Sequence, residues 1–144
     1  WQVPVAFMQH LKAGADFVTP EGKVVPNRML TVAPPPARSY AYMTDTLFRE
    51  RFAEYVRGVD LLYHEATYGR ELEAVAKENY HSTSEQAARM AVLAGAGKLL
   101  LGHFSARYSD PSCLLPEARA IFPETYVCTD GDVYDIPVQK RLGI

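Results

Sequence analysis

The 144-residue chain has a formal net charge of −2 at pH 7, with 48% hydrophobic and 22% charged residues. This length and composition are typical of one globular domain with a buried core and argue against disorder. The charge gives no overall attraction to nucleic acid, although a local basic patch stays compatible with it. No apolar run is long enough to cross a bilayer, so we expect no membrane partner. The two cysteines, Cys113 and Cys128, lack C-x-x-C spacing and indicate reduced thiols in a cytoplasmic protein.

The first part of the chain carries few helix signals. PEG at 20–22 indicates a turn between short β-branched runs, and PPPAR at 34–38 indicates a stiff connector. We therefore expect an extended lead-in segment over 1–37 and a β/α core over 38–144, together forming a single partial domain over 1–144. Because the chain begins with WQVPVAF and no methionine, we also expect it to be part of a larger protein.

After residue 38 the apolar spacing alternates between strand-like and helix-like runs. The expected elements are strands at 39–45, 60–68 and 98–103, helices at 47–57, 84–97 and 113–122, a helix or loop at 69–80, and a closing strand pair at 124–138. The pattern Ser82-x-x-Glu85 is a capping box that predicts the start of the second helix. The β-α-β-α-β-α-β order predicts an α/β layer with right-handed crossovers.

Acidic and imidazole side chains stand where the expected strands end. Asp45 ends the first strand, His64 and Glu65 end the second, and His103 ends the third, while His81 precedes a helix. Functional groups gather at the carboxyl edge of such sheets, and burying these groups without partners is costly. Metal ligation is one explanation, because Asp oxygens and neutral His nitrogens are usual zinc ligands.

Each of these residues also has a structural interpretation. A histidine at a strand end is commonly a hydrogen-bonded structural residue, and we interpret His64 in that way. Asp45 stands before LFRERF, where it fits a helix N-cap. Nucleophilic catalysis by Ser82 beside His81 is a weaker alternative, because the G-x-S-x-G elbow is absent. The residue pattern alone therefore leaves metal binding and structural roles both open.

Four segments, taken with their order and spacing, form a family-specific pattern: YMTDT, LLYHEATY, YHSTSEQAA and LLLGHFSARY. Together they resemble the C-terminal half of ribonuclease Z, the tRNA 3′-processing endonuclease family of the metallo-β-lactamase superfamily. The resemblance covers most of the chain. It implies an α/β fold that is the C-terminal half of a metallo-β-lactamase αβ/βα sandwich. It also implies a cytoplasmic, homodimeric, zinc-dependent endoribonuclease that removes the 3′ trailer of precursor tRNA.

The resemblance also implies a role for each matching residue. Asp45 is similar to the carboxylate that bridges two zinc ions, and His103 to a terminal ligand of one of them. His81 is similar to the proton donor for the leaving 3′ oxygen, and Glu65 to the partner that orients it. The residues implied to shape the pocket around the RNA are Ser82, Thr83, Arg107 and Tyr108.

The family's H-x-H-x-D-H motif does not occur in these 144 residues. Two Zn²⁺ ions need more donors than Asp45 and His103 provide, so we expect weak zinc binding and no tRNA cleavage by this chain alone. The missing N-terminal half is then a required partner. One sheet face would stay uncovered, and we expect a companion fragment, a second copy or a rearranged N-terminal segment to cover it. Two alternatives remain open: another metallo-β-lactamase-fold phosphodiesterase or hydrolase, and a non-catalytic α/β binding module.

Overall fold

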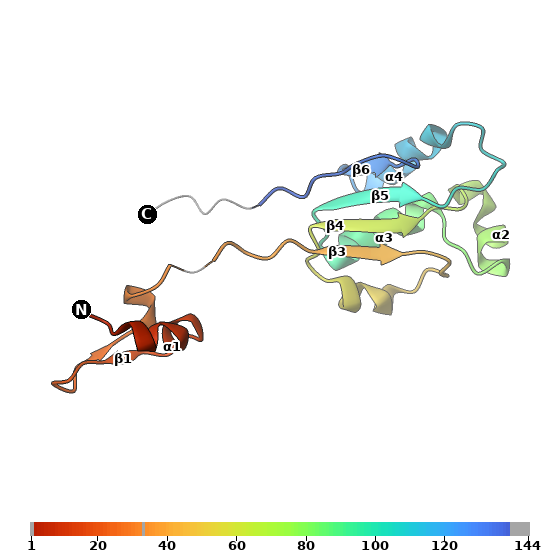
Figure 1. Cartoon of the computed structure of the whole chain (residues 1–144). Helices are drawn as coiled ribbons and strands as arrows, with labels where there is room; N and C mark the ends of the chain where they lie inside the picture. Colours follow the sequence, from red (N-terminus) through yellow and green to blue (C-terminus); the bar gives the residue numbers. More distant parts are fainter. Residues whose placement is uncertain (1, 33, 139–144) are drawn as a thin grey trace. The chain divides into compact units, whose positions relative to one another are not determined.

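The computed structural model describes residues 2–32 and 34–138. The chain divides into two compact units, the first ending at Pro36 and the second spanning Ala37–Val138 (Figure 1). This division falls next to the boundary expected between 37 and 38. That the whole of 1–144 behaves as one partial domain stays a prediction.

The first unit is folded, so the expectation of an extended segment over 1–37 is wrong for most of it. Its elements are the 3-10 helices η1 (Val5–Phe7) and η2 (Asn27–Met29), the helix α1 (Met8–Lys12), and the paired antiparallel strands β1 (Phe17–Val18) and β2 (Val24–Val25). Leu11, Phe17 and Val25 form its core. The predicted turn joins the strands, with Gly22 at φ +82°. Elements this short show no apolar period, so the sequence pattern did not reveal them.

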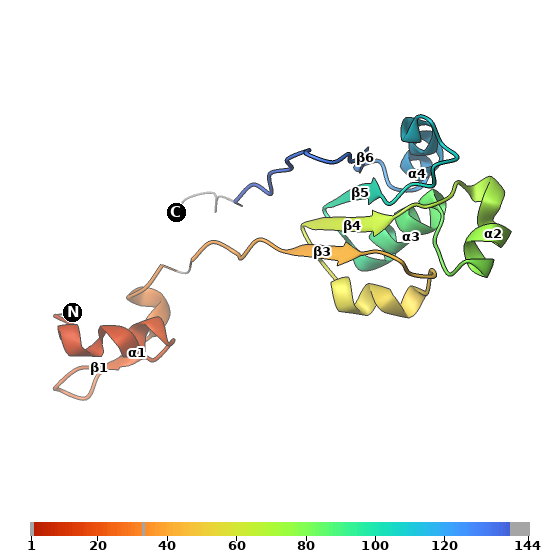
Figure 2. The ribbon, with the colours of Figure 1, turned by 45° about the vertical axis from the view of Figure 1, so that its right-hand side comes forward.

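The second unit is built on a four-stranded parallel sheet, as the alternating pattern predicts. The strands are β3 (Tyr40–Met43), β4 (Leu61–Glu65), β5 (Lys98–Gly102) and β6 (Thr125–Val127), in the order β3-β4-β5-β6. The helical segments between them are η3 (Glu50–Val56), η4 (Arg70–Leu72), α2 (Glu73–Glu78), α3 (Ser84–Ala94), η5 (Pro111–Leu114) and α4 (Leu115–Ile121). Helix α3 lies against the sheet (Figure 2).

The strand register brings the carboxyl ends of the sheet level with one another. Met43 pairs with His64 across β3 and β4, and Glu65 pairs with Gly102 across β4 and β5. Because all four strands run the same way, the loops that follow them leave from one edge. The side chains just beyond these strands are therefore brought close together.

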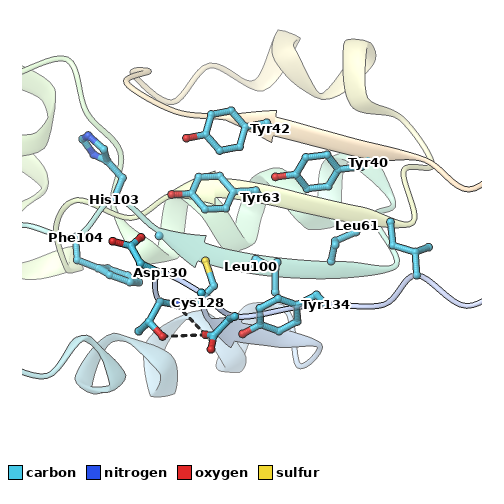
Figure 3. Close-up of a pocket in the computed structure, with 15 residues that line it drawn as sticks. Tyr40, Tyr42, Leu61, Tyr63, Leu100, His103, Phe104, Cys128, Asp130 and Tyr134 are labelled. Carbon is cyan, nitrogen blue, oxygen red and sulfur yellow. Dashed lines mark hydrogen bonds between the residues drawn. The ribbon is translucent and has the colours of Figure 1, made fainter.

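Side chains alternate between a buried face and an open face of the sheet. Leu62, Leu99 and Leu101 are fully buried in the core that includes α3. The opposite face carries Tyr40, Tyr42 and Tyr63, of which Tyr40 is 54% exposed and Tyr42 is 60% exposed. This face lines an open hollow of about 840 Å³ (Figure 3).

Helix α3 begins one residue later than the predicted capping box implies. Its N-cap is Thr83, whose hydroxyl accepts from the Gln86 N–H at 3.2 Å, while the Gln86 side chain accepts from the Thr83 N–H at 3.0 Å. Ser82 and Glu85 fit the same motif, but the Ser82 hydroxyl donates to the Thr46 carbonyl at 2.6 Å. A tertiary hydrogen bond thus decides between two overlapping motifs.

Two further expectations about elements hold only in part. The segment expected as a helix over 47–57 is the 3-10 helix η3, whose N-cap is Arg49 without a side-chain bond, so Asp45 is not a helix cap. Of the closing strand pair over 124–138, only β6 forms a strand among the described residues. A turn closed by Asp132, which accepts from the Thr129 N–H at 2.9 Å, follows β6 instead.

Candidate metal centre

Four of the residues singled out by the sequence lie at the carboxyl edge of the sheet. Asp45 lies two residues beyond β3, Glu65 is the last residue of β4, and His103 follows β5 directly. His81 lies in the loop before α3 and reaches the same edge through its contact with Glu65. The level strand ends explain why residues up to 58 positions apart in the chain meet here.

The metal-ligand candidates lie within reach of one ion. The Nε2 atom of His103 lies 3.3 Å from the Oδ1 atom of Asp45. One possible ligand atom from each of Asp45, His81 and His103 lies within 4.8 Å of the others, and the two imidazole centroids are 5.2 Å apart. Carboxylate oxygen and imidazole nitrogen are fitting zinc donors, and a catalytic zinc ion takes three protein ligands. The donor set therefore fits one ion and is too small for two.

The backbone at this cluster adopts an uncommon conformation. Asp45 has φ +49° and His103 has φ +56°, both in the left-handed region that residues other than glycine seldom occupy. Such a conformation costs on the order of 1–3 kcal/mol per residue and is retained where the surroundings require it. Both residues leave their strands through this strained turn, which brings the two side chains together.

Glu65 is the hub of the site. Its side chain is fully buried, and its two oxygens accept four hydrogen bonds. The donors are the Thr46 N–H at 2.5 Å, the Thr67 hydroxyl at 2.6 Å, His81 Nδ1 at 3.0 Å and the Ser82 N–H at 3.1 Å. These donors offset the cost of burying the carboxylate. Since His81 donates from Nδ1, its Nε2 atom stays available at the site.

Sequence reasoning missed Thr46 and Thr67. Thr46 takes part through its backbone N–H, for which a sequence gives no signal. Thr67 does carry a signal, because it lies two residues after Glu65 and so falls on the same side of the extended chain. Its hydroxyl also lies 2.9 Å from Nδ1 of His103.

The residues predicted to shape an RNA pocket have local partners. Ser82 and Thr83 are buried, the first bonded to Glu65 and the second capping α3. The Tyr108 hydroxyl accepts from the Gly69 N–H at 2.7 Å and donates to Glu71 at 2.6 Å. Partial burial and the bond to Glu71 raise the pKa of Tyr108 above its usual value.

Arg107 is exposed on the loop that precedes Tyr108. The structure thus brings Ser82 into contact with Glu65 and leaves Arg107 on the surface. The contact of these residues with RNA stays a prediction.

His64 has the surroundings of a structural residue. It is fully buried, and its Nδ1 atom lies 2.7 Å from the Glu65 carbonyl. Its Nε2 atom has no hydrogen-bond partner among the described residues. Burial lowers the pKa of His64, which keeps the ring neutral near pH 7.

The chain belongs to the β-lactamase superfamily, since the family model described as "Beta-lactamase superfamily domain" matches residues 8–104. It is 50% identical over 131 residues to the ribonuclease Z of Bacteroides thetaiotaomicron, covering 91% of this chain and 42% of that protein. It is 45% identical over 130 residues to the ribonuclease Z of Porphyromonas gingivalis, covering 90% of this chain and 43% of the relative. The chain thus spans less than half the length of these curated relatives.

Two solved structures have a similar fold. The metallo-β-lactamase fold protein YhfI from Bacillus subtilis matches with a TM-score of 0.63 and 27% identity, over 68% of this chain and 40% of that one. The short form of human tRNase Z matches with a TM-score of 0.56 and 29% identity, over 80% of this chain and 37% of that one. The predicted metallo-β-lactamase fold and the resemblance to ribonuclease Z are thereby confirmed. In the stretches that the structure covers, no helix has the length and apolarity to cross a membrane.

Proposed function

We propose that this chain is the C-terminal half of a zinc-dependent, cytoplasmic endoribonuclease that removes the 3′ trailer of precursor tRNA. The 3.3 Å approach of Asp45 and His103, beside the His81–Glu65 pair, is the observation that carries the proposal. The similarity of the chain to ribonuclease Z, which covers 91% of its residues, supports the same assignment. The activity belongs to a longer protein, because the chain spans 42% of that relative.

In this proposal Asp45 and His103 would hold zinc, and Asp45 would be the carboxylate that two ions share in the intact site. Zinc bound there would lower the pKa of a water molecule and neutralise charge on the phosphate. The remaining ligands come from the N-terminal half, because Asp45 and His103 supply two donors, and even with His81 the cluster would suit one ion at most. This donor count also gives the physical reason to expect weak metal binding by the chain alone.

The pair of His81 and Glu65 handles the proton in this proposal. Glu65 holds Nδ1 of His81 at 3.0 Å and is itself fixed by three further donors. In its imidazolium form His81 carries a second hydrogen on Nε2, and it delivers this proton to the 3′ oxygen that leaves when the phosphodiester breaks, which returns the ring to the neutral Nδ1–H form. A general acid in this position contributes on the order of 10²–10⁴-fold to the rate. Ser82, Thr83, Arg107 and Tyr108 are proposed to shape the RNA pocket around it.

A second candidate is another metallo-β-lactamase-fold hydrolase, such as a phosphodiesterase, and the similarity to YhfI supports the fold that both candidates share. The TM-score with YhfI is 0.63, against 0.56 with the human tRNase Z. Substrate size separates the two candidates. A site for precursor tRNA should favour the large substrate strongly, whereas a small-molecule hydrolase should not distinguish a tRNA trailer from other RNA.

A chimera tests the proposed function. The part of the Bacteroides thetaiotaomicron ribonuclease Z that precedes the matched region is joined to this chain. We expect the chimera, with zinc or manganese, to cleave a precursor tRNA at its 3′ trailer and to lose this activity with His81→Ala. His10→Ala is the matched control, because the ring contact of His10 is with Phe7 of the same unit.

A chimera that hydrolyses bis(p-nitrophenyl) phosphate but leaves the precursor intact would overturn the assignment. Robust metal-dependent cleavage of the precursor by the 144-residue chain alone would contradict the expectation that the activity needs the N-terminal half.

A further inference from the structure

Thr67 links Glu65 to His103. It lies two residues beyond the end of β4 and is 6% exposed. Its hydroxyl oxygen lies 2.6 Å from Oε2 of Glu65 and 2.9 Å from Nδ1 of His103. A single hydroxyl therefore joins the buried carboxylate to the imidazole that faces Asp45.

The direction of these two hydrogen bonds follows from a count of protons. The carboxylate of Glu65 only accepts, and its oxygens already face N–H donors from Thr46, Ser82 and His81. The single proton of the Thr67 hydroxyl must therefore go to Glu65. The oxygen of Thr67 then has only lone pairs to offer His103, so Nδ1 of His103 must carry a hydrogen and donate it.

A neutral imidazole with its hydrogen on Nδ1 has its lone pair on Nε2. In His103 this is the atom that lies 3.3 Å from Asp45. Only a nitrogen with a free lone pair binds a metal ion, and the hydrogen bond at the other ring nitrogen selects which one that is. The Thr67 hydroxyl thus turns the metal-binding atom of His103 toward Asp45.

We propose that Thr67 is a positioning residue that fixes His103 as the Nδ1–H tautomer. Glu65 then orients both imidazoles of the site, His81 directly and His103 through Thr67. The tautomer follows from the hydrogen bonds alone, whereas its value for metal binding rests on the proposed function. The two parts are separable by experiment.

Two substitutions isolate the hydroxyl. Thr67→Val keeps the shape of the side chain and removes the hydroxyl, while Thr67→Ser keeps the hydroxyl. Both leave the Thr67 carbonyl, which accepts from the Ser105 N–H at 3.0 Å and anchors the following loop. A purely structural role of Thr67 would make the two variants differ in stability but not in the tautomer of His103.

The first test reads the tautomer directly in the full 144-residue chain by long-range ¹⁵N–¹H correlation, at a pH where His103 is neutral. We expect a protonated Nδ1 in the wild type and in Thr67→Ser, and a shift toward protonated Nε2 in Thr67→Val. The exposed His10 should show the same spectrum in all three proteins. An Nε2–H tautomer in the wild type, or an unchanged tautomer in Thr67→Val, would overturn the proposal.

The second test titrates zinc into the same three proteins. Loss of a group that orients a ligating histidine weakens metal binding by roughly 10–100-fold, and we expect this for Thr67→Val with recovery in Thr67→Ser. Equal affinity in all three proteins would contradict the role of Thr67 in metal binding. A wild-type affinity that survives His103→Ala would instead contradict the metal site of the proposed function, and the tautomer result would stand.

Discussion

At the scale of single residues, the site is organised around a buried carboxylate. Glu65 accepts from two backbone N–H groups, one hydroxyl and one imidazole, so its charge is balanced by donors from three segments of the chain. A buried charge with this many donors rigidifies what it touches, because each lost partner would leave a costly unpaired group. The hydrogen bond to Glu65 thus fixes the orientation of the His81 ring.

Zinc affinities of two variants can separate the roles of His81 and His103. The geometry would also allow His81 as a third metal ligand, since a ligating histidine commonly donates its other N–H to a carboxylate. If His81 is the proton donor, His81→Ala in the chimera should leave the zinc dissociation constant nearly unchanged. His103→Ala removes a direct donor and should weaken binding by at least the roughly 10–100-fold that a supporting group costs.

Isothermal titration calorimetry of the metal-free chimera measures both constants. His10→Ala serves as the control that should match the wild type. Comparable losses in His81→Ala and His103→Ala would make His81 a ligand and contradict its role as the acid.

The buried His64 predicts a pH-dependent stability. Burial lowers its pKa from the usual 6.5, so below about pH 6.5 the unfolded state binds a proton that the folded state does not. The free energy of unfolding should therefore fall as the pH drops from about 7.5 to 5.5, and by less in His64→Asn, whose amide keeps a donor near the Nδ1 position. Urea unfolding across this range measures the slope. His10→Ala should keep the wild-type slope, and an equal slope in His64→Asn would refute this origin.

At the scale of elements, the site depends on where strands stop and where α3 starts. Four parallel strands end at one edge, and the left-handed residues Asp45 and His103 turn the chain there. The loop before α3 brings Ser82 and His81 to the same edge, and the capping box of Thr83 and Gln86 fixes the first turn of the helix. The capping box and the loop that carries His81 and Ser82 are therefore adjacent in the chain but use separate hydrogen bonds.

The position of the capping box gives a prediction at this scale. Thr83→Ala should lower the free energy of unfolding by about 0.5–2 kcal/mol, because the Gln86 N–H loses its acceptor. Gln86→Ala should also destabilise, since it removes the reciprocal bond to the Thr83 N–H. Glu85→Ala is the matched control, and its surface ion pairs with Arg70 and Arg89 are worth less than about 1 kcal/mol. If thermal unfolding shows a larger loss of stability in Glu85→Ala than in Gln86→Ala, the capping box starts at Ser82 and this prediction is wrong.

At the scale of the whole molecule, one face of the sheet is covered and the other is open. The open face holds Tyr40 and Tyr42, and the Tyr42 ring stacks on Tyr63 at 4.5 Å. His103 stands at the rim of the hollow over this face (Figure 3). Partial burial raises the pKa of Tyr63. Monomeric proteins rarely expose an aromatic surface of this kind to water, so we expect another protein segment to cover this face.

We expect the isolated chain to self-associate through this open face, because a second copy is one of the covers expected for it and the N-terminal half is then missing. Light scattering should give a mass that rises with concentration, and an apolar dye should fluoresce on the species that stays monomeric. Tyr42→Ser should reduce both signals, whereas Tyr55→Ser should not, because Tyr55 is exposed on η3 outside the hollow. A stable monomer without dye binding would contradict this prediction.

The sequence by itself determined the alternating α/β order and the residues that carry chemistry. Apolar periodicity revealed the long buried elements, and the segments around Asp45, Glu65, His81 and His103 carried the resemblance to a family. These signals are local, so a linear pattern records them. The folding of the first unit escaped notice because its strands have two residues each.

Only the tertiary structure decided how these residues are connected. Hydrogen bonds between distant segments chose Thr83 over Ser82 as the helix cap and made Thr67 the link between Glu65 and His103. The close approach of Asp45 and His103 needs level strand ends and two left-handed turns. Such contacts depend on which segments the fold places side by side, and no spacing along the chain encodes that.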